Sequence, residues 1–411
     1  MVFDFAVIIF LITYTGVAIG EIPGLAIDRT GIALLGAILM VVFGVLSTKE
    51  AILSIDISTI LLLYGLMVLS SQFRLGGFYT WVALKITKFM DKPEKFLFVM
   101  MGVSAVLSAI LANDIVCLAF TPVLTVSLLN AGLNPIPFLI GLAVSSNIGS
   151  ASTIIGNPQN MLIGQLGKLD FGHFFLWCTP PSLLSLIGAY FVINIIYSKN
   201  FMGNNSPAII ERRAWASFNR HQSTKGIIAT FILIILFFTE IPREISAISI
   251  AGLLLCSRSM HTRSILGFID WHLITLFCAL FIVIKGIESV NLPFTIVEFL
   301  NANSIDIHNL YILTIFSTML SNFVSNVPAT MLITKFLDPL NHTQWYVLAL
   351  SSTFAGNLIT IGSIANLITF EQAKEYGVNI SFKEHAKVGI PVTVVSIFIT
   401  ILWIIIQRYI F

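Results

Sequence analysis

Charge is the first thing that this sequence has little of. Only 10% of its 411 residues are Asp, Glu, Lys or Arg, while 57% are hydrophobic. Soluble globular domains carry about 25% charged residues, so this composition excludes that class. The formal net charge of +2 is also too small to predict nucleic-acid binding. We therefore expect a polytopic membrane protein whose surroundings are the lipid bilayer.

Several chemical motifs are absent as well. No GxxxxGK phosphate loop occurs, so the chain has no nucleotide site of its own. The four cysteines are far apart, lack metal-ligand spacing and are interpreted as packing residues. The apolar runs contain no His/Glu metal pair and no nucleophile motif. We therefore predict no enzymatic activity, no cofactor and no resident metal ion.

What the chain does contain is a series of apolar runs long enough to cross a bilayer as helices. The first run, 2–20, has no Lys or Arg before it and no small-residue cleavage site, so we expect a retained span rather than a signal peptide. The others lie at 30–46, 57–73, 175–197, 225–240, 245–257, 270–287 and 386–408.

Two pairs of shorter apolar runs flank polar tips, which predicts re-entrant hairpins rather than full spans. The first tip is Asn113-Asp114 and the second is Ser325-Asn326. A run interrupted by polar residues follows each hairpin and is interpreted as a broken span. The hairpin arms are 97–111 with 115–130 and 308–320 with 327–338, and the broken spans are 137–166 and 345–370.

The second half of the chain repeats the first. The segment 145–160, SSNIGSASTIIGNPQN, aligns without a gap with 351–366, SSTFAGNLITIGSIAN, which predicts an internal duplication. An odd number of spans per copy gives the two copies opposite orientations in the membrane. The predicted fold is thus an all-α polytopic membrane protein with about ten transmembrane helices plus two re-entrant hairpins in two inverted repeats.

The predicted boundaries follow from this duplication. Repeat 1 covers 1–197, a cytoplasmic linker covers 198–225 and repeat 2 covers 226–411. Within the repeats, scaffold helices lie in 1–73 and 226–287, and each hairpin with its broken helix lies in 95–168 and 308–370. Phe78 to Lys92 is amphipathic and predicts a helix at the membrane interface, with a weaker counterpart at 293–301.

The distribution of basic residues predicts the orientation. With ten spans, one side of the membrane receives sixteen of the 22 Lys and Arg residues and the other side receives six. The positive-inside rule places the larger group in the cytoplasm. Both termini are therefore expected outside the cytoplasm, at a plasma (inner) membrane that the chain crosses many times.

The break at 145–164 is the most informative segment for function. Gly149, Gly156 and Pro158 favour an interruption at membrane depth, where irregular polar backbone is tolerated only if it is buried in protein or lines a watery cavity. The alternative is a loop outside the bilayer. Gly356 and Gly362 are the corresponding hinges in the second copy. The substrate-binding candidates share amide or hydroxyl side chains and are Asn113, Asn147, Ser150, Ser152, Thr153, Asn157, Asn160, Ser325, Asn326, Asn357, Thr360, Ser363 and Asn366.

Asp114 is the most informative single residue. A carboxylate in apolar sequence is costly at membrane depth, and such a residue is a candidate proton carrier or cation ligand. Helix capping is the structural alternative for Asp114, and both roles are compatible. Cys117, three residues further on, is a less favoured candidate thiol ligand for a soft metal or metalloid, because a free cysteine is often only a small buried apolar residue.

Basic residues are missing from the four central segments, 112–117, 145–160, 321–331 and 353–366. A multiply charged anion would have to be held there by helix N-termini and bound cations alone. This absence favours a neutral hydroxylated solute.

Four segments, in this order, resemble the ion transporter superfamily: ANDIVCLAFTP (112–122), GNPQNMLIG (156–164), SNVPATMLI (325–333) and TIGSIANLI (360–368). Within it they are similar to the arsenite permease (ArsB) branch and the anion permeases grouped with that branch. Sodium-coupled dicarboxylate members carry Ser-Asn-Thr at both hairpin tips, whereas the tips here read Ala112-Asn113-Asp114 and Ser325-Asn326-Val327. The acid resembles the proton-coupled arsenite permeases, while GNPQN resembles the other anion permeases.

The resemblance implies an elevator-like transport unit of hairpins and broken helices on a scaffold of the first three spans of each repeat. On this basis we expect efflux of arsenite or antimonite as the neutral trihydroxide, in exchange for protons. One alternative is a sodium- or proton-coupled anion (oxyanion or dicarboxylate) transporter, or a Na+/H+ transporter, of the same fold. Another is the membrane subunit of an ATP-driven arsenite pump, with a soluble ATPase on loops such as 198–225. A homodimer is a further possible assembly.

Overall fold

The computed structural model describes residues 2–20, 24–202, 217–303 and 306–410, and these residues form helices without a β-strand. The first half contains α1 (Val2–Ile19), α2 (Arg29–Val42), α3 (Thr48–Leu53), α4 (Ile57–Leu75), α5 (Phe78–Ile86), α6 (Pro93–Leu111), α7 (Asn113–Asn130), α8 (Pro135–Ser150), α9 (Pro158–Leu166) and α10 (Phe171–Tyr197). The second half contains α11 (Arg220–Leu236), α12 (Arg243–Leu255), α13 (Thr262–Leu266), α14 (Trp271–Ser289), α15 (Leu292–Ala302), α16 (Leu310–Val324), α17 (Asn326–Ile333), α18 (His342–Ala355), α19 (Ile364–Lys374) and α20 (Phe382–Ile410).

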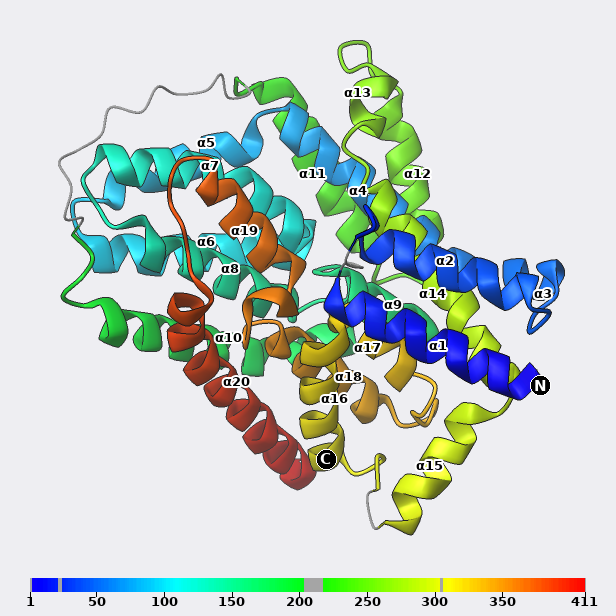
Figure 1. Cartoon of the computed structure of the whole chain (residues 1–411). Helices are drawn as coiled ribbons and strands as arrows, with labels where there is room; N and C mark the ends of the chain where they lie inside the picture. The colour runs from blue at the N-terminus through cyan, green and yellow to red at the C-terminus, as the bar shows by residue number, and fades with distance from the viewer. Residues whose placement is uncertain (1, 21–23, 203–216, 304–305, 411) are drawn as a thin grey trace.

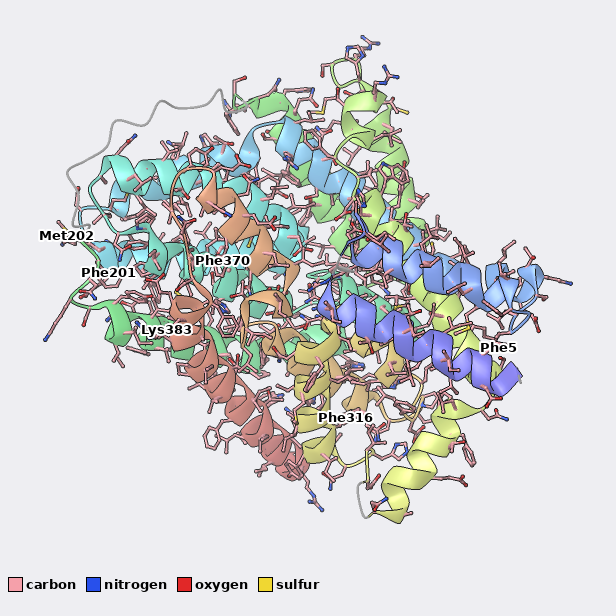
Figure 2. All side chains as sticks on the ribbon, in the orientation of Figure 1. Phe5, Phe201, Met202, Phe316, Phe370 and Lys383 are labelled. Carbon is pink, nitrogen blue, oxygen red and sulfur yellow. The ribbon has the colours of Figure 1, made fainter. Side chains whose placement is uncertain are left out.

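The lengths and surfaces of these helices are those of a membrane-spanning protein. Six of them, α4, α6, α7, α10, α14 and α20, are long and apolar enough to cross a bilayer, and four shorter ones are also apolar. Side chains fill the spaces between the ribbons (Figure 2), and the buried apolar residues form one core. Large apolar side chains such as Phe231 and Phe398 also face outward, as lipid surroundings allow. The predicted class, a helical polytopic membrane protein, is confirmed.

The packing follows the two repeats. In the two repeats, α12 corresponds to α2 and α14 corresponds to α4. The contacts are exchanged between the halves, because α2 packs on α14 and α4 packs on α12. The same exchange holds for α7 with α19 and α17 with α9, while α6 packs on α8 as α16 packs on α18. In Figure 1, α10 and α20 lie along one side of the molecule, and these two helices contact each other. The molecule therefore has the inverted-repeat arrangement.

Most predicted spans became helices with bounds shifted by a few residues. α11 begins at Arg220, inside the predicted linker 198–225, because the Asn219 side chain accepts a hydrogen bond from the Gln222 N–H and caps the helix. Residues 203–216 of that linker, including Arg212 and Arg213, lie outside the described residues. The interfacial segment forms α5, and its counterpart forms α15.

The structure shows the surroundings of two aspartates at helix starts and of the cysteines. Asp56 and Asp270 cap α4 and α14, since each side chain accepts from a backbone N–H three residues on. Cys117 and Cys178 are buried, as expected for packing residues. Cys256 is exposed, because α12 ends at Leu255 and the thiol lies just beyond the packed face, so the packing interpretation is wrong for this residue.

Candidate functional site

The two broken helices have the same internal architecture. In the first, the Asn160 amide nitrogen donates to the carbonyl oxygens of Ser150 (3.2 Å) and Thr153 (3.0 Å). In the second, the Asn366 amide nitrogen donates to the corresponding carbonyls of Gly356 (2.8 Å) and Ile359 (3.3 Å). One asparagine in each copy thus satisfies the carbonyls freed where α8 and α18 stop. A break at membrane depth, as predicted, requires its carbonyls to be satisfied within the protein in this way.

The second half of each broken helix is capped from within the break. The Asn157 side chain accepts from the Asn160 N–H (2.8 Å) at the start of α9, and the Ser363 hydroxyl accepts from the Ala365 N–H (3.2 Å) at the start of α19. Pro158 is the first residue of α9, where its fixed φ favours a helix and its missing N–H costs nothing. Both breaks therefore restart as helices that point their N-termini toward the same region.

The hairpin tips reach these breaks. Each reversal occurs at a non-glycine residue with positive φ, Ala112 (59°) or Ser325 (76°). The Asn113 N–H donates to the Gly156 carbonyl (3.0 Å). The Asn326 amide, in the orientation that satisfies its hydrogen bonds, donates to Ser352 and Gly362 carbonyls at 3.1 Å each. Both tips therefore end beside the breaks, midway along the broken spans, as the predicted re-entrant hairpins require.

Serine pairs hold each hairpin arm parallel to its broken helix. The hydroxyls of Ser104 on α6 and Ser145 on α8 hydrogen bond to each other, and those of Ser317 on α16 and Ser351 on α18 do so at 2.6 Å. Such bonds between small residues let helix backbones approach closely in lipid. The same contact in both copies is a structural counterpart of the sequence repeat.

Asn147 joins the two repeats. Its Oδ1 accepts from the amide of Asn113 (3.1 Å) and from the hydroxyl of Ser363 (2.9 Å). Its Nδ2 donates to the amide oxygens of Asn357 (3.0 Å) and Asn366 (3.2 Å). All of its polar capacity is therefore used within the protein, and Asn147 positions the first hairpin tip against the second break in this conformation.

Thr353 is a residue of the breaks that sequence reasoning missed. Its hydroxyl accepts from the Asn157 amide (3.2 Å) and also lies within hydrogen-bond distance of Asn160 Oδ1 (3.5 Å) and Gln159 Nε2 (3.4 Å). These contacts mirror those of Asn147 across the repeat. The signal was present, because the gapless alignment pairs Thr353 with Asn147. The candidates predicted in the second break all follow Gly356, so Thr353 was passed over.

A small cavity lies where both tips and both breaks meet. Its volume is about 20 Å³, which is room for about one water molecule. The N-termini of α7, α9, α17 and α19 are all at this cavity. The lining contains amides, hydroxyls and one acid, but no Lys, Arg or His. It consists of Asn113, Asp114, Pro158, Gln159, Ser325, Asn326, Val327, Gly362, Ser363 and Ile364.

Two groups in the cavity have unused hydrogen-bond capacity. Asn113 is 5% exposed, and its Oδ1 has no partner among the described residues because its nitrogen faces Asn147. The Asp114 carboxylate, in the first turn of α7, likewise accepts no hydrogen bond within the described part of the chain. A carboxylate so placed requires a proton, a cation or a donor ligand to offset its desolvation.

The remaining predicted site residues surround the cavity without lining it. Ser150, Asn157, Asn160 and Asn366 are fully buried in the hydrogen bonds of the breaks. Their substrate-binding roles, and those of the lining residues, remain predictions. The others outside the lining are Ser152, Thr153, Asn357, Thr360 and the glycines Gly149, Gly156 and Gly356. Cys117 is buried behind Asp114, and the described residues hold no cluster of three metal-ligating side chains.

A vestibule of about 520 Å³ leads to the cavity from one face of the protein. Ser325, Val327 and Ile364 line both spaces. The charged residues of the vestibule are Asp28, Asp270, Glu371 and Arg29, together with His272. Acids therefore outnumber permanent cations in the path to the cavity, which favours entry of neutral or cationic solutes over anions.

On the opposite face an arginine joins the end of the first broken span to a scaffold helix. Arg243, in the first turn of α12, donates to the carbonyl oxygens of Gly164 and Leu169 at 2.6 Å each, just where α9 ends. Its neighbour Glu244 accepts from Gln165 (3.1 Å) and from Ser58 on α4 (3.2 Å). Scaffold helices α4 and α12 therefore hold the end of the first broken span on the face away from the vestibule.

We expect Arg243→Gln to release this contact. Two charge-assisted hydrogen bonds are lost, and a net weakening of about 2 kcal/mol would raise the population open on this face roughly tenfold or more. The measurement is the labelling rate of Gln159→Cys, in a Cys256→Ser background, by an impermeant thiol reagent added to this face. Arg258→Gln is the matched control, since Arg258 is exposed. Equal rates in both variants would contradict the prediction.

Comparisons with known proteins give one family model and several relatives. A protein-family model described as "Citrate transporter" (CitMHS) matches residues 7–355. The chain is 26% identical to a "46 kDa membrane protein" of Mycobacterium leprae, over 95% of this chain and 96% of that protein. It is 25% identical to the "Putative transporter arsB" of Dictyostelium discoideum (91% and 87% covered). It is also 27% identical to the "Silicon efflux transporter LSI3" of Oryza sativa subsp. japonica (91% and 92%).

One solved structure has a similar fold throughout. The YdaH transporter of Alcanivorax borkumensis, whose topology is described as unusual, superposes with a TM-score of 0.57 at 11% sequence identity. The superposition covers 99% of this chain and 98% of that protein. The likeness concerns the fold alone.

Proposed function

Because the chain belongs to the citrate transporter (CitMHS) family of membrane transporters, we propose that it is a secondary transporter and, from the chemistry of its cavity lining, that it exports a neutral metalloid hydroxide, arsenite or antimonite, in exchange for protons. It is a secondary transporter of this ArsB-like group and a multi-pass membrane protein. In the proposed cycle, hairpins and broken helices move as an elevator against the scaffold helices. Asp114 carries the proton, and the solute is held between the hairpin tips and the breaks.

The observation that carries this proposal is the chemistry of the cavity lining. A trihydroxide donates hydrogen bonds, and the cavity offers the unpaired Oδ1 of Asn113 and the carboxylate of Asp114 as acceptors. The uncapped N-termini of α7 and α17 supply N–H donors for the hydroxide oxygens. The closed cavity of about 20 Å³ is smaller than the solute, so it must widen during transport.

Anions fit this lining less well. Citrate at neutral pH carries several negative charges, and no cationic side chain lines the cavity to balance them. The four helix N-termini attract negative charge, but the Asp114 carboxylate already occupies the first turn of α7. In the second copy Val327 takes its place. The acidic vestibule would also repel an approaching anion.

Two relatives support the solute class. One is named a putative arsB transporter and the other a silicon efflux transporter. Silicon and trivalent arsenic are both present in neutral water as uncharged hydroxides. The solutes that both names indicate are therefore neutral hydroxides, which a site of amides and hydroxyls would fit. The description of the family model instead indicates citrate, an anion.

The second candidate is a coupled transporter of an oxyanion, a dicarboxylate or sodium, favoured by the description of the family model and by the helix N-termini at the cavity. A third is the membrane subunit of an ATP-driven pump, in which a soluble ATPase would bind the 198–225 connection.

We further propose a plasma membrane location with both termini outside, so that the vestibule opens to the cytoplasm, as export requires. A homodimer is the proposed assembly.

Competition at the transport site tests the solute class. Everted vesicles should accumulate arsenite, and antimonite or silicic acid in excess should reduce the initial rate. An equal excess of citrate should leave the rate unchanged. Uptake of labelled citrate by these vesicles, absent from protein-free vesicles, would instead support the anion transporter.

A further inference from the structure

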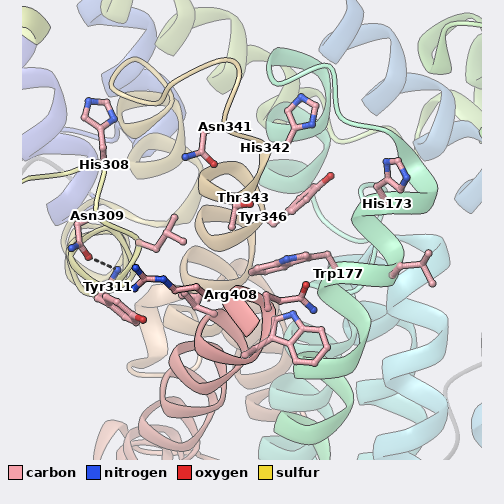
Figure 3. Close-up of a pocket in the computed structure, with 15 residues that line it drawn as sticks. His173, Trp177, His308, Asn309, Tyr311, Asn341, His342, Thr343, Tyr346 and Arg408 are labelled. Carbon is pink, nitrogen blue, oxygen red and sulfur yellow. Dashed lines mark hydrogen bonds between the residues drawn. The ribbon is translucent and has the colours of Figure 1, made fainter. Parts of the chain in front are cut away.

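A second pocket lies on the face opposite the vestibule. It has a volume of about 900 Å³ and opens between the start of α10, the starts of α16 and α18, and the end of α20 (Figure 3). The broken span α18–α19 begins at this pocket and reaches the vestibule at Glu371, in the last turns of α19. It shares no lining residue with the cavity or the vestibule, so the proposed transport cycle gives it no role.

The charge of this pocket is positive and unbalanced. Arg408 in the last turn of α20 has no ion pair or hydrogen bond to any described residue. Figure 3 shows Arg408 extending toward Asn309 and Tyr311 at the start of α16. No Asp or Glu is among the lining residues. An arginine at such a position is a ready partner for a phosphate, which accepts two parallel N–H bonds from the guanidinium.

A helix terminus adds donors to the same pocket. α16 is capped by the Asn309 side chain and α10 by that of Asp170, whereas Asn341 makes no side-chain cap on α18. The first-turn residues His342 and Thr343 of α18 line the pocket. Free N–H groups and the positive end of the helix dipole favour an anion there. Arg408 and this terminus are independent features of one cavity.

One wall of the pocket is aromatic and apolar and continues into the outward-facing surface. Trp177 and Tyr346 lie with ring centroids 5.4 Å apart, and Trp177 also meets Trp403 at 6.5 Å. Leu176, in the same lining, is 68% exposed, and α20 presents Phe398 and Leu402 outward below the pocket. Tryptophan and tyrosine are typical of the level where lipid headgroups meet the hydrocarbon.

The three histidines of the lining do not make this a metal site. His173, His308 and His342 all line the pocket, as Figure 3 shows. His173 lies 3.7 Å from the Asp170 carboxylate, and His308 is near the Gln344 amide. No group of three His, Cys, Asp or Glu side chains among the described residues has ligating geometry. An anionic ligand therefore fits the pocket better than a cation.

We propose that this pocket binds one anionic phospholipid, with the phosphate at Arg408 and the start of α18 and the acyl chains along the outward faces of α10 and α20. The requirement for an anionic head follows from the unpaired guanidinium and the acid-free lining. The requirement for chains follows from the aromatic wall and its exposed apolar continuation. Such a lipid would bridge the second hairpin arm α16 to α10 and α20.

Binding to the purified full-length protein tests this proposal. Delipidated protein in a neutral detergent is titrated with phosphatidylglycerol or phosphatidylcholine of the same chains, and the thermal midpoint is followed. Phosphatidylglycerol should raise the midpoint with saturation, and phosphatidylcholine should not. Arg408→Gln should raise the half-saturating phosphatidylglycerol concentration at least about fivefold. Arg258→Gln, at an exposed position outside the pocket, should leave it unchanged.

Two further arms separate the sources of phosphate. Inorganic phosphate and glycerol phosphate should fail to reproduce the shift, because the chains contribute to binding. An equal shift with either would identify a free-anion site and overturn the lipid proposal. Equal stabilisation by phosphatidylcholine, or an unchanged half-saturation in Arg408→Gln, would also overturn it. Native mass spectrometry gives a second measurement, with one tightly retained phosphatidylglycerol per chain expected in the wild type and none in Arg408→Gln.

Discussion

Asp114→Asn should abolish proton-driven accumulation of arsenite while leaving exchange of arsenite for arsenite intact. The substitution keeps the size of the side chain at the cavity but removes its proton-binding capacity. No other acid lines the cavity. We expect the gradient-dependent rate in vesicles to fall at least about tenfold, because membrane-depth carboxylates are the groups that couple proton and solute movement. Exchange of labelled arsenite, with equal concentrations on both sides, should stay within about twofold of the wild type.

The exchange of labelled arsenite separates loss of proton coupling from loss of folding. A misfolded variant would lose both activities, whereas an uncoupled variant loses only the first. Asp56→Asn is the matched control. Asp56 caps α4 through one hydrogen bond to Thr59 (2.7 Å), and asparagine caps a helix equally well. Accumulation by Asp114→Asn that still follows the proton gradient would remove Asp114 from the mechanism.

Gly149→Ala should prevent stable folding, because α6 and α8 touch at this glycine. A Cβ at Gly149 would overlap the backbone of Ala105 on α6, which cannot move aside as a side chain can. Overpacking of this kind costs about 3 kcal/mol or more. The serine pairs beside it, Ser104–Ser145 and Ser108–Ser146, depend on the same close approach. The expected result is a thermal midpoint at least about 10 °C lower, or loss of folded protein on gel filtration.

Gly102→Ala on the same α6 helix is the control. A Cβ at Gly102 meets nothing within 4 Å. Alanine is also the better helix former, by about 0.5–1 kcal/mol, so this variant should be as stable as the wild type or slightly more stable. A Gly149→Ala protein with the thermal midpoint of Gly102→Ala would show that the helices do not approach as closely as described.

The sequence predicts the breaks and the hairpin tips of this fold because local chemistry determines them. Glycine, proline and asparagine interrupt helices wherever they occur together, and the gapless match of 145–160 with 351–366 marks the same break twice. The meeting of both tips and both breaks at one cavity then follows from the inverted repeat. The residues lining that cavity are ones that sequence reasoning singled out, with the additions of Gln159, Val327 and Ile364.

What sequence reasoning does not reveal is pairing between segments far apart in the chain. Asn147 reaches Asn357 and Asn366, and Arg243 reaches Gly164, through contacts that no local pattern encodes. The direction of each amide is also a tertiary property, and it decides that Asn113 presents an oxygen rather than a nitrogen to the cavity. The pocket at Arg408 combines the ends of four helices, so no single stretch of sequence shows it.

Proton-coupled export of a neutral hydroxide is tested most directly by arsenite uptake into everted vesicles that contain this protein. The uptake is measured with an imposed proton gradient and, separately, with an imposed sodium gradient of equal size. The cavity of acceptors around Asp114 predicts accumulation that the proton gradient drives and the sodium gradient does not. Accumulation of citrate or another anion driven by sodium, with no arsenite uptake under either gradient, would contradict it.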